Sequence, residues 1–389
     1  MKSVSHVFEV AVSLEVRKKS VHTVCKKKRK SKIFKEYKED EERAVRDSEY
    51  WITHYFQINH KYLFIYEGTA RKVRRIVVPA FRELTVQHCI VEALKPLFRR
   101  GMYKHTYAAI PKWRAKSGNK INDIDQLIWD LRGAHAGKKV IEKWLRTDRK
   151  NTKYVLKMDI RHFFESIDHE LLKEKFRKYV HDERMLDLIY QTIDIVVDGE
   201  IVDRGLPLGF DTSHWYANWY LQDLDHFIKE ELRAVYYIRY MDDMVIFGSN
   251  KRKLHRMKDE IERYLKEKLD LELKGDWQVF RFVYKEVDIE IDGKIKHRQY
   301  GRDLDFMGFR FYRNRTAMRK SIMLRATRKA KKISKKDQPT IYDTRQMASY
   351  NSYLKSTDTY NVYEKYIKPY VSMKKMRQKI SRYDKNHRR

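Results

Sequence analysis

The chain has 389 residues, a length that predicts two or three packed units, and its 86 Lys and Arg against 54 Asp and Glu give a formal charge of +32. A charge of this size repels itself unless a polyanion neutralises it, so nucleic acid is the expected partner; no apolar run approaches the roughly 20 residues that span a membrane. Cys25 and Cys89 are too few for a disulfide framework or a thiolate zinc site, and no hydrophobic leader is evident, so a reducing cytoplasm is the expected setting.

The first sixty residues differ from the rest of the chain in their charge pattern. A dense basic cluster, Lys26 to Lys32, is followed by the acidic run Glu39 to Glu42. Charge runs of this kind are typical of exposed polar chain. Residues 1–60 are therefore predicted to be a basic N-terminal arm or extension.

Residues 61–150 are predicted to form a first mixed α/β unit. Two segments in this range are bordered by Gly and Pro, as strands often are. They are YLFIYEG, which starts at Tyr62, and RKVRRIVVP, which starts at Arg71. Helical spacing follows in the apolar residues Ile124, Leu127, Ile128 and Leu131.

Residues 151–315 are predicted to form a second, larger α/β unit. KYVLKMDI indicates a strand that leads to Asp159, and the apolar spacing of residues 213–232 predicts one long helix. VYYIRY and MVIFG flank Asp242 and Asp243, which predicts a hairpin with both Asp residues at its tip. A further helix and the apolar patch LDFMGFRFY, from Leu304, complete this unit.

Residues 316–389 are strongly basic, helical in pattern and interleaved with tyrosines. Lys and Arg can hold phosphates while exposed Tyr rings stack on bases or sugars, although many of these tyrosines would be ordinary half-buried residues. The segment is predicted to be a helical unit that follows the backbone of a duplex.

The Asp242-Asp243 pair is the clearest chemical signal. Adjacent carboxylates repel unless a cation is present. If the strand that leads to Asp159 is a neighbour of the hairpin, three carboxylates would hold two Mg²⁺ ions about 3.5–4 Å apart, an arrangement that performs phosphoryl transfer. The alternative is a solvated Asp-Asp turn, but the apolar strands on both sides favour the metal site.

Four segments resemble, in order and spacing, the palm motifs of reverse transcriptases, and together they are far more specific than YMDD alone. They are DIRHFFESIDH from Asp159, GLPLGFDTSHWYANWYLQDLD from Gly205, YMDD from Tyr240 and LDFMGF from Leu304. The resemblance covers about residues 70 to 320 and implies an α/β (α+β) right-hand polymerase. Its fingers would be residues 61–150, its palm of antiparallel sheet plus helices residues 151–315 with part of the fingers, and its basic helical thumb residues 316–389.

The resemblance also implies the metal ligands. Asp159, Asp242 and Asp243 resemble the metal-binding carboxylates, and the backbone carbonyl of Ile160 is a further expected ligand. Two Mg²⁺ ions are the expected cofactor, with Mn²⁺ as an alternative, and dNTPs are the expected substrate.

Other residues resemble those that contact the nucleotide. Phe164 resembles the aromatic steric gate, whose ring would clash with a 2′-hydroxyl, and Phe163 beside it is the expected core aromatic. Lys274 resembles the lysine that protonates pyrophosphate, with a template-backbone contact as the alternative. The triphosphate clamp is expected among Lys72, Arg74 and Arg75, with Lys112 and Arg114 as weaker matches, although each could instead be a solvated surface cation.

Leu208 stands before Gly209 where most reverse transcriptases have Gln, whose amide contacts the incoming nucleotide. With Ser213 and Asn218, this resembles the reverse transcriptases of diversity-generating retroelements, although His214 departs from their usual Ser-Gln. An aliphatic side chain cannot donate a hydrogen bond to the nucleotide, so wrong pairs would be penalised less. Low fidelity follows as a hypothesis.

This narrower resemblance implies mutagenic retrohoming, in which cDNA is made from a template RNA with misincorporation opposite adenine. The expected partners are the template RNA, the RNA/cDNA duplex and an oligomeric, basic accessory variability protein, with no membrane, in the cytoplasm of a bacterial or phage-infected cell.

Other interpretations stay open. A phage-defence or retron-like reverse transcriptase is the nearest, and a group II intron maturase is weaker because only about seventy residues follow the palm. From another class, the chain could be a catalytically idle RNA-binding scaffold, which the three intact carboxylates argue against.

Overall fold

The computed structural model describes residues 3–27, 31–67, 72–108, 133–291 and 294–386. The chain packs as two compact units, each built from segments that are separate in the sequence. Unit 1 comprises Met1–Leu131, Met158–Ala234 and Arg256–Trp277, and unit 2 comprises Arg132–Lys157, Val235–His255 and Gln278–Arg389. Both units contain helices and strands, as the sequence predicts. Across the described ranges, no helix is long and apolar enough to cross a membrane.

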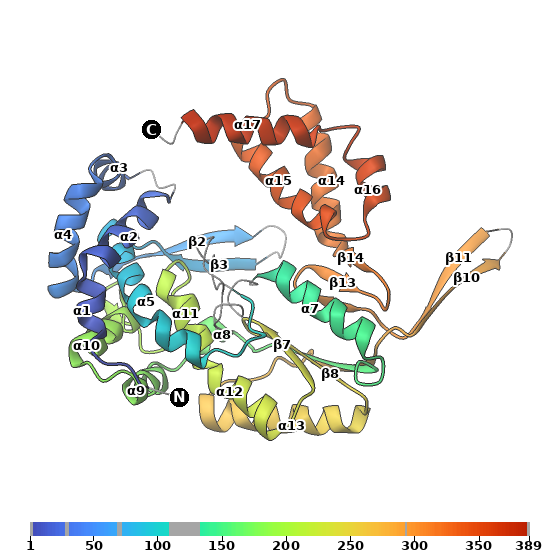
Figure 1. Cartoon of the computed structure of the whole chain (residues 1–389), viewed down its shortest axis with the longest axis horizontal. Coiled ribbons are helices and arrows are strands. Elements are labelled where there is room, and N and C mark those ends of the chain that lie inside the picture. Colours follow the sequence, from blue (N-terminus) through green and yellow to red (C-terminus); the bar gives the residue numbers. More distant parts are fainter. Residues whose placement is uncertain (1–2, 28–30, 68–71, 109–132, 292–293, 387–389) are drawn as a thin grey trace, which may run out of the picture. The chain divides into compact units, whose positions relative to one another are not determined.

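The N-terminal residues of unit 1 fold into helices that pack on α5 (Phe81–Gly101), as Figure 1 shows. They are α1 (Val7–Val12), α2 (Leu14–Cys25), α3 (Lys32–Glu39) and α4 (Glu41–Thr53). Val21, Val24 and Phe34 are buried in one apolar cluster with Phe81 and Leu84 of α5. The interpretation of this region as exposed polar chain is therefore wrong for its described residues. Burial of its apolar side chains outweighs the charge runs between them.

Unit 1 also contains two small sheets. β2 (Tyr62–Glu67) and β3 (Lys72–Val77) form the predicted antiparallel hairpin. β1 (Asn59–His60), β5 (Val196–Val197) and β6 (Glu200–Ile201) form the second sheet, with β1 parallel to β5. An apolar cluster of Val77, Ile195, Val197 and Phe210 holds the end of β3 against this second sheet.

Helices occupy most of the segment 158–234. They are α8 (Phe163–Ser166), α9 (His169–Tyr179), α10 (Glu183–Ile193), α11 (Asp211–Tyr220), α12 (Gln222–His226) and the π-helix η1 (Phe227–Glu231). The single helix predicted for residues 213–232 is thus wrong, because the chain turns at Leu221 and then widens into η1. Leu221, Leu224 and Ile228 are all fully buried, so the apolar spacing continues through the break and does not reveal it.

The main sheet of unit 2 has four strands in the order β7-β8-β4-β9. β7 (Tyr236–Tyr240) and β8 (Asp243–Gly248) form the predicted hairpin, while β4 (Tyr154–Met158) pairs antiparallel with β9 (Gln278–Arg281). Helix α7 (Ala134–Thr147) packs on the sheet through Trp144, which stacks on Tyr236 with 4.9 Å between ring centroids. Helix α13 (Lys251–Leu269) follows β8 and buries Ile261 and Leu265, as predicted.

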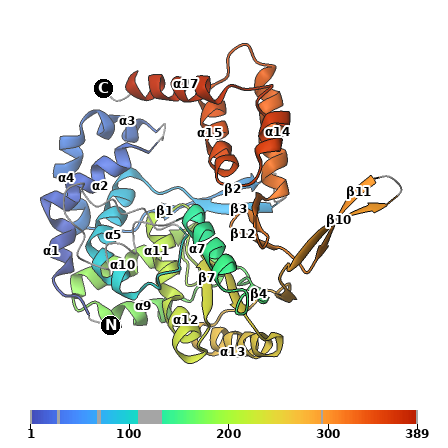
Figure 2. The same cartoon turned by 45° about the vertical axis from the view of Figure 1, so that its right-hand side comes forward.

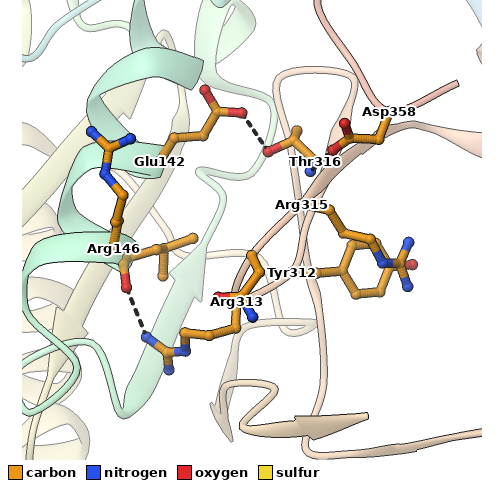
Figure 3. A pocket seen from close by; sticks show the side chains of 9 residues that line it. Glu142, Arg146, Tyr312, Arg313, Arg315, Thr316 and Asp358 are labelled. Atoms are coloured by element: carbon orange, nitrogen blue, oxygen red, sulfur yellow. Dashed lines mark hydrogen bonds between the residues drawn. The ribbon is translucent and has the colours of Figure 1, made fainter. Parts of the chain in front are cut away.

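The residues after β9 form two further sheets in unit 2. β12 (Leu304–Phe306), β13 (Phe309–Phe311) and β14 (Thr316–Met318) are antiparallel neighbours. A cavity of about 400 Å³ lies between α7 and the β13–β14 connection (Figure 3). There Thr316 donates to Glu142 at 2.6 Å, and Arg313 donates to the Leu145 carbonyl at 3.3 Å. β10 (Lys285–Ile291) and β11 (Lys294–Tyr300) form a separate ribbon that projects from unit 2 (Figure 2).

The C-terminal part of unit 2 is helical, as predicted. Its helices are α14 (Lys320–Ser334), α15 (Ile341–Lys355), α16 (Tyr360–Tyr366) and α17 (Met373–Asn386). Asp343, whose side chain is 3% exposed, lies 2.8 Å from Lys329 and 2.7 Å from Lys336. It also accepts from the Thr340 N–H in a capping box. Hydrogen bonds from Lys329 and Lys336 hold the pKa of this carboxyl well below its usual range.

We expect Asp343→Asn to lower the free energy of unfolding by about 2 kcal/mol at pH 7, because charge-assisted hydrogen bonds are lost. Folding lowers the pKa of Asp343, so its contribution is fully present above the unfolded pKa of about 4 and is lost as the pH falls through the folded value. Urea denaturation from pH 7 to pH 3 measures this change. Asp337→Asn, which neutralises an exposed carboxylate nearby, is the control. A difference from wild type that does not shrink below pH 4 would contradict this account.

Candidate active site

In unit 1, the end of β3 contacts the loop before α11. The Val77 N–H donates to the Leu208 carbonyl at 2.8 Å. Gly209 has a φ of 118°, and a Cβ atom on it would lie 2.1 Å from the Val77 carbonyl oxygen. Glycine is required here because a side chain would both clash and strain the backbone. The β2–β3 hairpin is thus fastened to the loop that carries Leu208.

The same loop pairs with the segment that carries Phe164. The Leu206 N–H donates to the Phe164 carbonyl at 2.7 Å. Phe163 is 2% exposed and is a core residue, as predicted, whereas Phe164 is half-buried. The Phe164 ring stands edge-on to His214, with 5.5 Å between centroids. The structure therefore places Phe164 beside the Leu206–Gly209 loop, and its role as a steric gate stays a prediction.

His214 is a site residue to which the sequence analysis gave no role. Burial lowers the pKa of its half-buried imidazole, and the nearby Asp211 carboxylate opposes this shift. Its Nδ1 atom has no hydrogen-bond partner among the described residues. A signal was present in the sequence, because His214 stands where the resembled motif has a neutral Gln. A neutral imidazole beside Phe164 is therefore part of this site.

Asp159 directly follows β4 and is held in unit 1 by the segment that carries Lys274. The Lys274 N–H donates to the Asp159 carbonyl at 2.8 Å, and the Arg161 N–H donates to the Glu272 carbonyl at 2.8 Å. These two backbone hydrogen bonds flank the antiparallel pair Ile160–Leu273. The Ile160 carbonyl takes no part in this bridge and is directed away from Leu273.

The Asp159 carboxylate and the Lys274 ammonium also lie together. Asp159 is 29% exposed, and its Oδ2 lies 3.4 Å from Lys274 Nζ. Asp159 is the main cause of a raised pKa for Lys274, so Lys274 stays protonated at neutral pH. The structure thus joins two of the predicted catalytic residues.

In unit 2, Asp242 lies in the turn of the β7–β8 hairpin and Asp243 begins β8, and both are half-buried. Tyr240 lies opposite Asp243, so Met241 and Asp242 form a two-residue turn, in which Met241 has a φ of 60°. Arg239 is fully buried in β7 and donates to the Met241 carbonyl at 3.0 Å. Arg239 was missed by the sequence analysis, although a single charged residue inside an apolar strand was a visible signal.

These carboxylates are chemically suited to a divalent cation, because Mg²⁺ prefers oxygen ligands and each of the three carboxyl groups is partly exposed. Within the ranges that the structure describes, no three His, Cys, Asp or Glu side chains are close enough together to hold a metal ion. The structure places Asp242 beside Asp243 and Asp159 beside Lys274. The assembly of all three into one metal site stays a prediction.

The predicted triphosphate clamp is only partly described. Arg74 and Arg75 are exposed neighbours in β3, so they lie on opposite faces of the hairpin. The Arg75 guanidinium lies 5.2 Å from the centre of the Tyr62 ring. The hairpin therefore presents no more than one of these two arginines to a given phosphate. Lys72 begins β3, whereas Lys112, Arg114 and the helix expected near Ile124 lie outside the described residues.

Comparison with known proteins identifies the family. Residues 70–276 match the family described as reverse transcriptase (RNA-dependent DNA polymerase), which is more than half of the chain. The chain therefore belongs to the reverse transcriptase family. This match, together with the mixed helices and strands, confirms the predicted fold class.

Individual relatives share low sequence identity with this chain and match only part of its length. The Retron Ec73 reverse transcriptase of Escherichia coli is 32% identical over 136 residues, which cover 32% of this chain and 41% of that protein. Protein YkfC of Escherichia coli K12 is 22% identical over 246 residues, covering 53% of this chain and 58% of YkfC. The apo telomerase of Candida tropicalis, truncated from its C-terminal domain, has a TM-score of 0.41 and 14% identity, covering 70% of this chain and 59% of that one. The chain thus spans less than two thirds of each of these proteins.

We expect Gly209→Ala to lower the free energy of unfolding by about 2–4 kcal/mol, since the added methyl group would meet the Val77 carbonyl at 2.1 Å in a strained backbone conformation. Thermal unfolding of purified variants measures the loss. Gly275→Ala is the matched control, because a Cβ atom there meets nothing within 4 Å. Equal stability of the two variants would show that the contact at Gly209 is not constraining.

Proposed function

We propose that this chain is an RNA-directed DNA polymerase that copies a template RNA into cDNA by two-metal phosphoryl transfer. The observation that carries the proposal is the strand order of the main sheet in unit 2. β4 ends one residue before Asp159, and its hydrogen-bonded neighbour β8 begins at Asp243. The proposal requires β4 to run antiparallel to β8, so that Asp159 and the hairpin turn reach the same edge of the sheet.

In this proposal Asp159, Asp242, Asp243 and the Ile160 carbonyl hold the metal ions. Two Mg²⁺ ions bound there, or Mn²⁺ in their place, would lower the pKa of the primer 3′-hydroxyl and neutralise charge on the triphosphate. Arg239 braces the turn through the Met241 carbonyl, which keeps the Asp242-Asp243 backbone in place. The partial exposure of the three carboxylates allows them to reach a solvated substrate.

Lys274 is proposed as the proton donor to the departing pyrophosphate. Its Nζ atom lies beside Asp159, and the raised pKa keeps the proton available until the leaving group develops charge. Arg74 or Arg75, with Lys72, would hold the phosphates from the fingers hairpin. Arg is suited to this task because its planar fork binds two phosphate oxygens at once.

The sugar and base of the dNTP would meet Phe164 and the Leu208-Gly209 loop. The half-buried Phe164 ring would occupy the space of a 2′-hydroxyl and so favour deoxynucleotides. Because the hydrogen bond with Val77 is made by the Leu208 carbonyl, the side chain at this position can differ among polymerases without loss of that bond.

The proposed domains are an extension at residues 1–60, fingers at 61–150, a palm at 151–315 and a thumb at 316–389. The thumb would follow an RNA/cDNA duplex. Exposed tyrosines support this role, including Tyr342, which is 69% exposed, and Tyr360, which is 72% exposed. The Lys329 ammonium lies 5.5 Å from the centre of the Tyr342 ring, so cations and rings are interleaved there.

We propose that the enzyme is a low-fidelity polymerase of the diversity-generating retroelement type, on the basis of Leu208. It would work with its template RNA and a basic, oligomeric accessory protein in the cytoplasm of a bacterial or phage-infected cell. A retron-like enzyme is the second candidate, and the 32% identity to the Retron Ec73 reverse transcriptase favours it.

Asp242→Asn combined with Asp243→Asn should reduce dNTP incorporation at least about 10³-fold, because the metal ligands lose their charge, while binding of RNA persists. Primer extension on an RNA template, with and without Mg²⁺, and filter binding measure the two properties. Asp187→Asn, an exposed carboxylate on α10, is the control. Undiminished synthesis by the double variant would place the active site elsewhere, and no synthesis by wild type would favour an RNA-binding scaffold.

Leu208→Gln should reduce misincorporation opposite template adenines by roughly ten-fold, since the Gln amide can donate a hydrogen bond that depends on correct geometry. Sequencing of cDNA made from a defined RNA template measures the error frequency at each base. Leu208→Met, which has a similar volume and no donor, should keep the wild-type frequency. Equal frequencies of misincorporation in all three proteins would remove the argument from Leu208 and favour the retron-like enzyme.

A further inference from the structure

The base of the projecting β10–β11 ribbon carries aromatic rings, of which Tyr284 is exposed and Tyr300 and Phe280 are half-buried. We define the ribbon foot as residues 280–285 and 298–302. Tyr300 lies opposite Lys285 in the register, and its carbonyl accepts from the Tyr284 N–H at 3.1 Å. The Tyr284 and Tyr300 rings are tilted by 51°, with 6.3 Å between their centroids. Tyr284 is 51% exposed, so the foot presents at least one aromatic ring to solvent.

Four cations lie against the aromatic rings of the ribbon foot. Arg281 lies 4.1 Å from the centre of the Tyr284 ring, and Arg298 lies 5.1 Å from that of Tyr300. Lys285 also faces Tyr300, and Arg302 lies 4.9 Å from the centre of the Phe280 ring. Within the part of the chain that the structure describes, none of these four cations forms an ion pair with a carboxylate.

The acidic residues nearest in sequence to the foot are engaged by other cations. Glu286 accepts from Arg315 at 2.7 Å. Asp303, which is 9% exposed, accepts from Arg310 at 2.7 Å. Neither carboxylate therefore forms an ion pair with the four cations of the foot, and the exposed surface there keeps its positive charge.

We propose that the ribbon foot, which adjoins the end of β4 opposite Asp159, binds an unpaired strand of nucleic acid. Aromatic rings interleaved with unpaired cations fit a single strand, because bases stack on the rings and phosphates meet the cations. An acidic peptide would satisfy the cations but leave the rings exposed. The buried Phe282 and Val283 anchor the foot, so its exposed side chains are not needed for the core. The inference goes beyond polymerase activity, since binding there needs no catalysis.

The first test measures the affinity of the full chain for a fluorescein-labelled, unstructured RNA of twenty nucleotides by anisotropy over a range of salt concentrations. Tyr284→Ala with Tyr300→Ala should weaken binding by about ten-fold or more. Arg281→Gln with Arg298→Gln and Arg302→Gln should reduce the slope of log affinity against log salt by roughly two. Matched controls are Tyr50→Ala, an exposed tyrosine on α4, and Lys251→Gln with Arg252→Gln and Lys253→Gln on α13. Foot variants that bind RNA as the controls do would overturn the proposal.

Two further measurements keep the result decisive. Ultraviolet crosslinking of wild-type chain to RNA that contains 4-thiouridine needs no variant; crosslinked peptides should include Tyr284 or Tyr300, and crosslinks confined to other regions would overturn the proposal. Labelled polyglutamate that loses affinity for the foot variants, while the RNA binds them as it binds wild type, would assign the foot to an acidic peptide and also overturn the proposal.

A primer-extension assay distinguishes catalysis from RNA binding at the ribbon foot. The foot variants should extend a primer annealed to a short RNA template with an overhang of only a few nucleotides within about two-fold of wild type, because that substrate has no unpaired strand beyond the few template nucleotides being copied. If wild type does not extend primers but the foot variants still lose RNA affinity, the polymerase proposal fails and the foot proposal stands.

Discussion

The close approach of two backbone segments at Val77 and Gly209 is the constraint on which the candidate nucleotide site of unit 1 depends. It places the end of the β2–β3 hairpin against the loop before α11, and the same loop forms a hydrogen bond with the backbone at Phe164. Three segments that are remote in the sequence are thereby joined by main-chain contacts. The backbone positions of Phe164 and Leu208 are thus fixed by these contacts, and substrate contact by their side chains stays a proposal.

Charge sets the second constraint. Lys274 lies beside Asp159, and the buried Arg239 donates to the Met241 carbonyl in the turn that carries Asp242. Adjacent carboxylates repel one another, so these cations make the acidic residues tolerable to the fold before any metal ion binds. We propose a different role for basic residues elsewhere, such as those of the ribbon foot, because cations beside aromatic rings are suited to nucleic acid.

Local pattern was enough to predict the strands β2, β3 and β4, the β7–β8 hairpin and the basic C-terminal helices, because each carries apolar spacing of one period bounded by Gly, Pro or charged residues. Tertiary packing decided where prediction failed. Val21 and Phe34 of the supposed polar arm are buried against α5, which charge runs alone cannot indicate. The break at Leu221 keeps its buried face and so leaves no trace in the spacing.

In the candidate site, too, some features follow from local sequence and others depend on tertiary packing. Gly209, Phe163 and the Asp242-Asp243 pair were visible in motifs, whereas the contribution of Arg239 depends on its burial and that of His214 on its contact with Phe164, fifty residues away. The separation of Arg74 and Arg75 onto opposite faces follows from strand geometry once β3 is known.

The central claim is that Asp159, Asp242 and Asp243 converge on one pair of metal ions. A crystal structure of the full chain with Mn²⁺, a primer–template and an incoming dNTP, with the ions located by anomalous scattering, tests this most directly. The account predicts two manganese peaks, each bound by carboxylate oxygens from this set of three residues. Manganese bound elsewhere, or Asp159 remote from the Asp242-Asp243 turn, would contradict it.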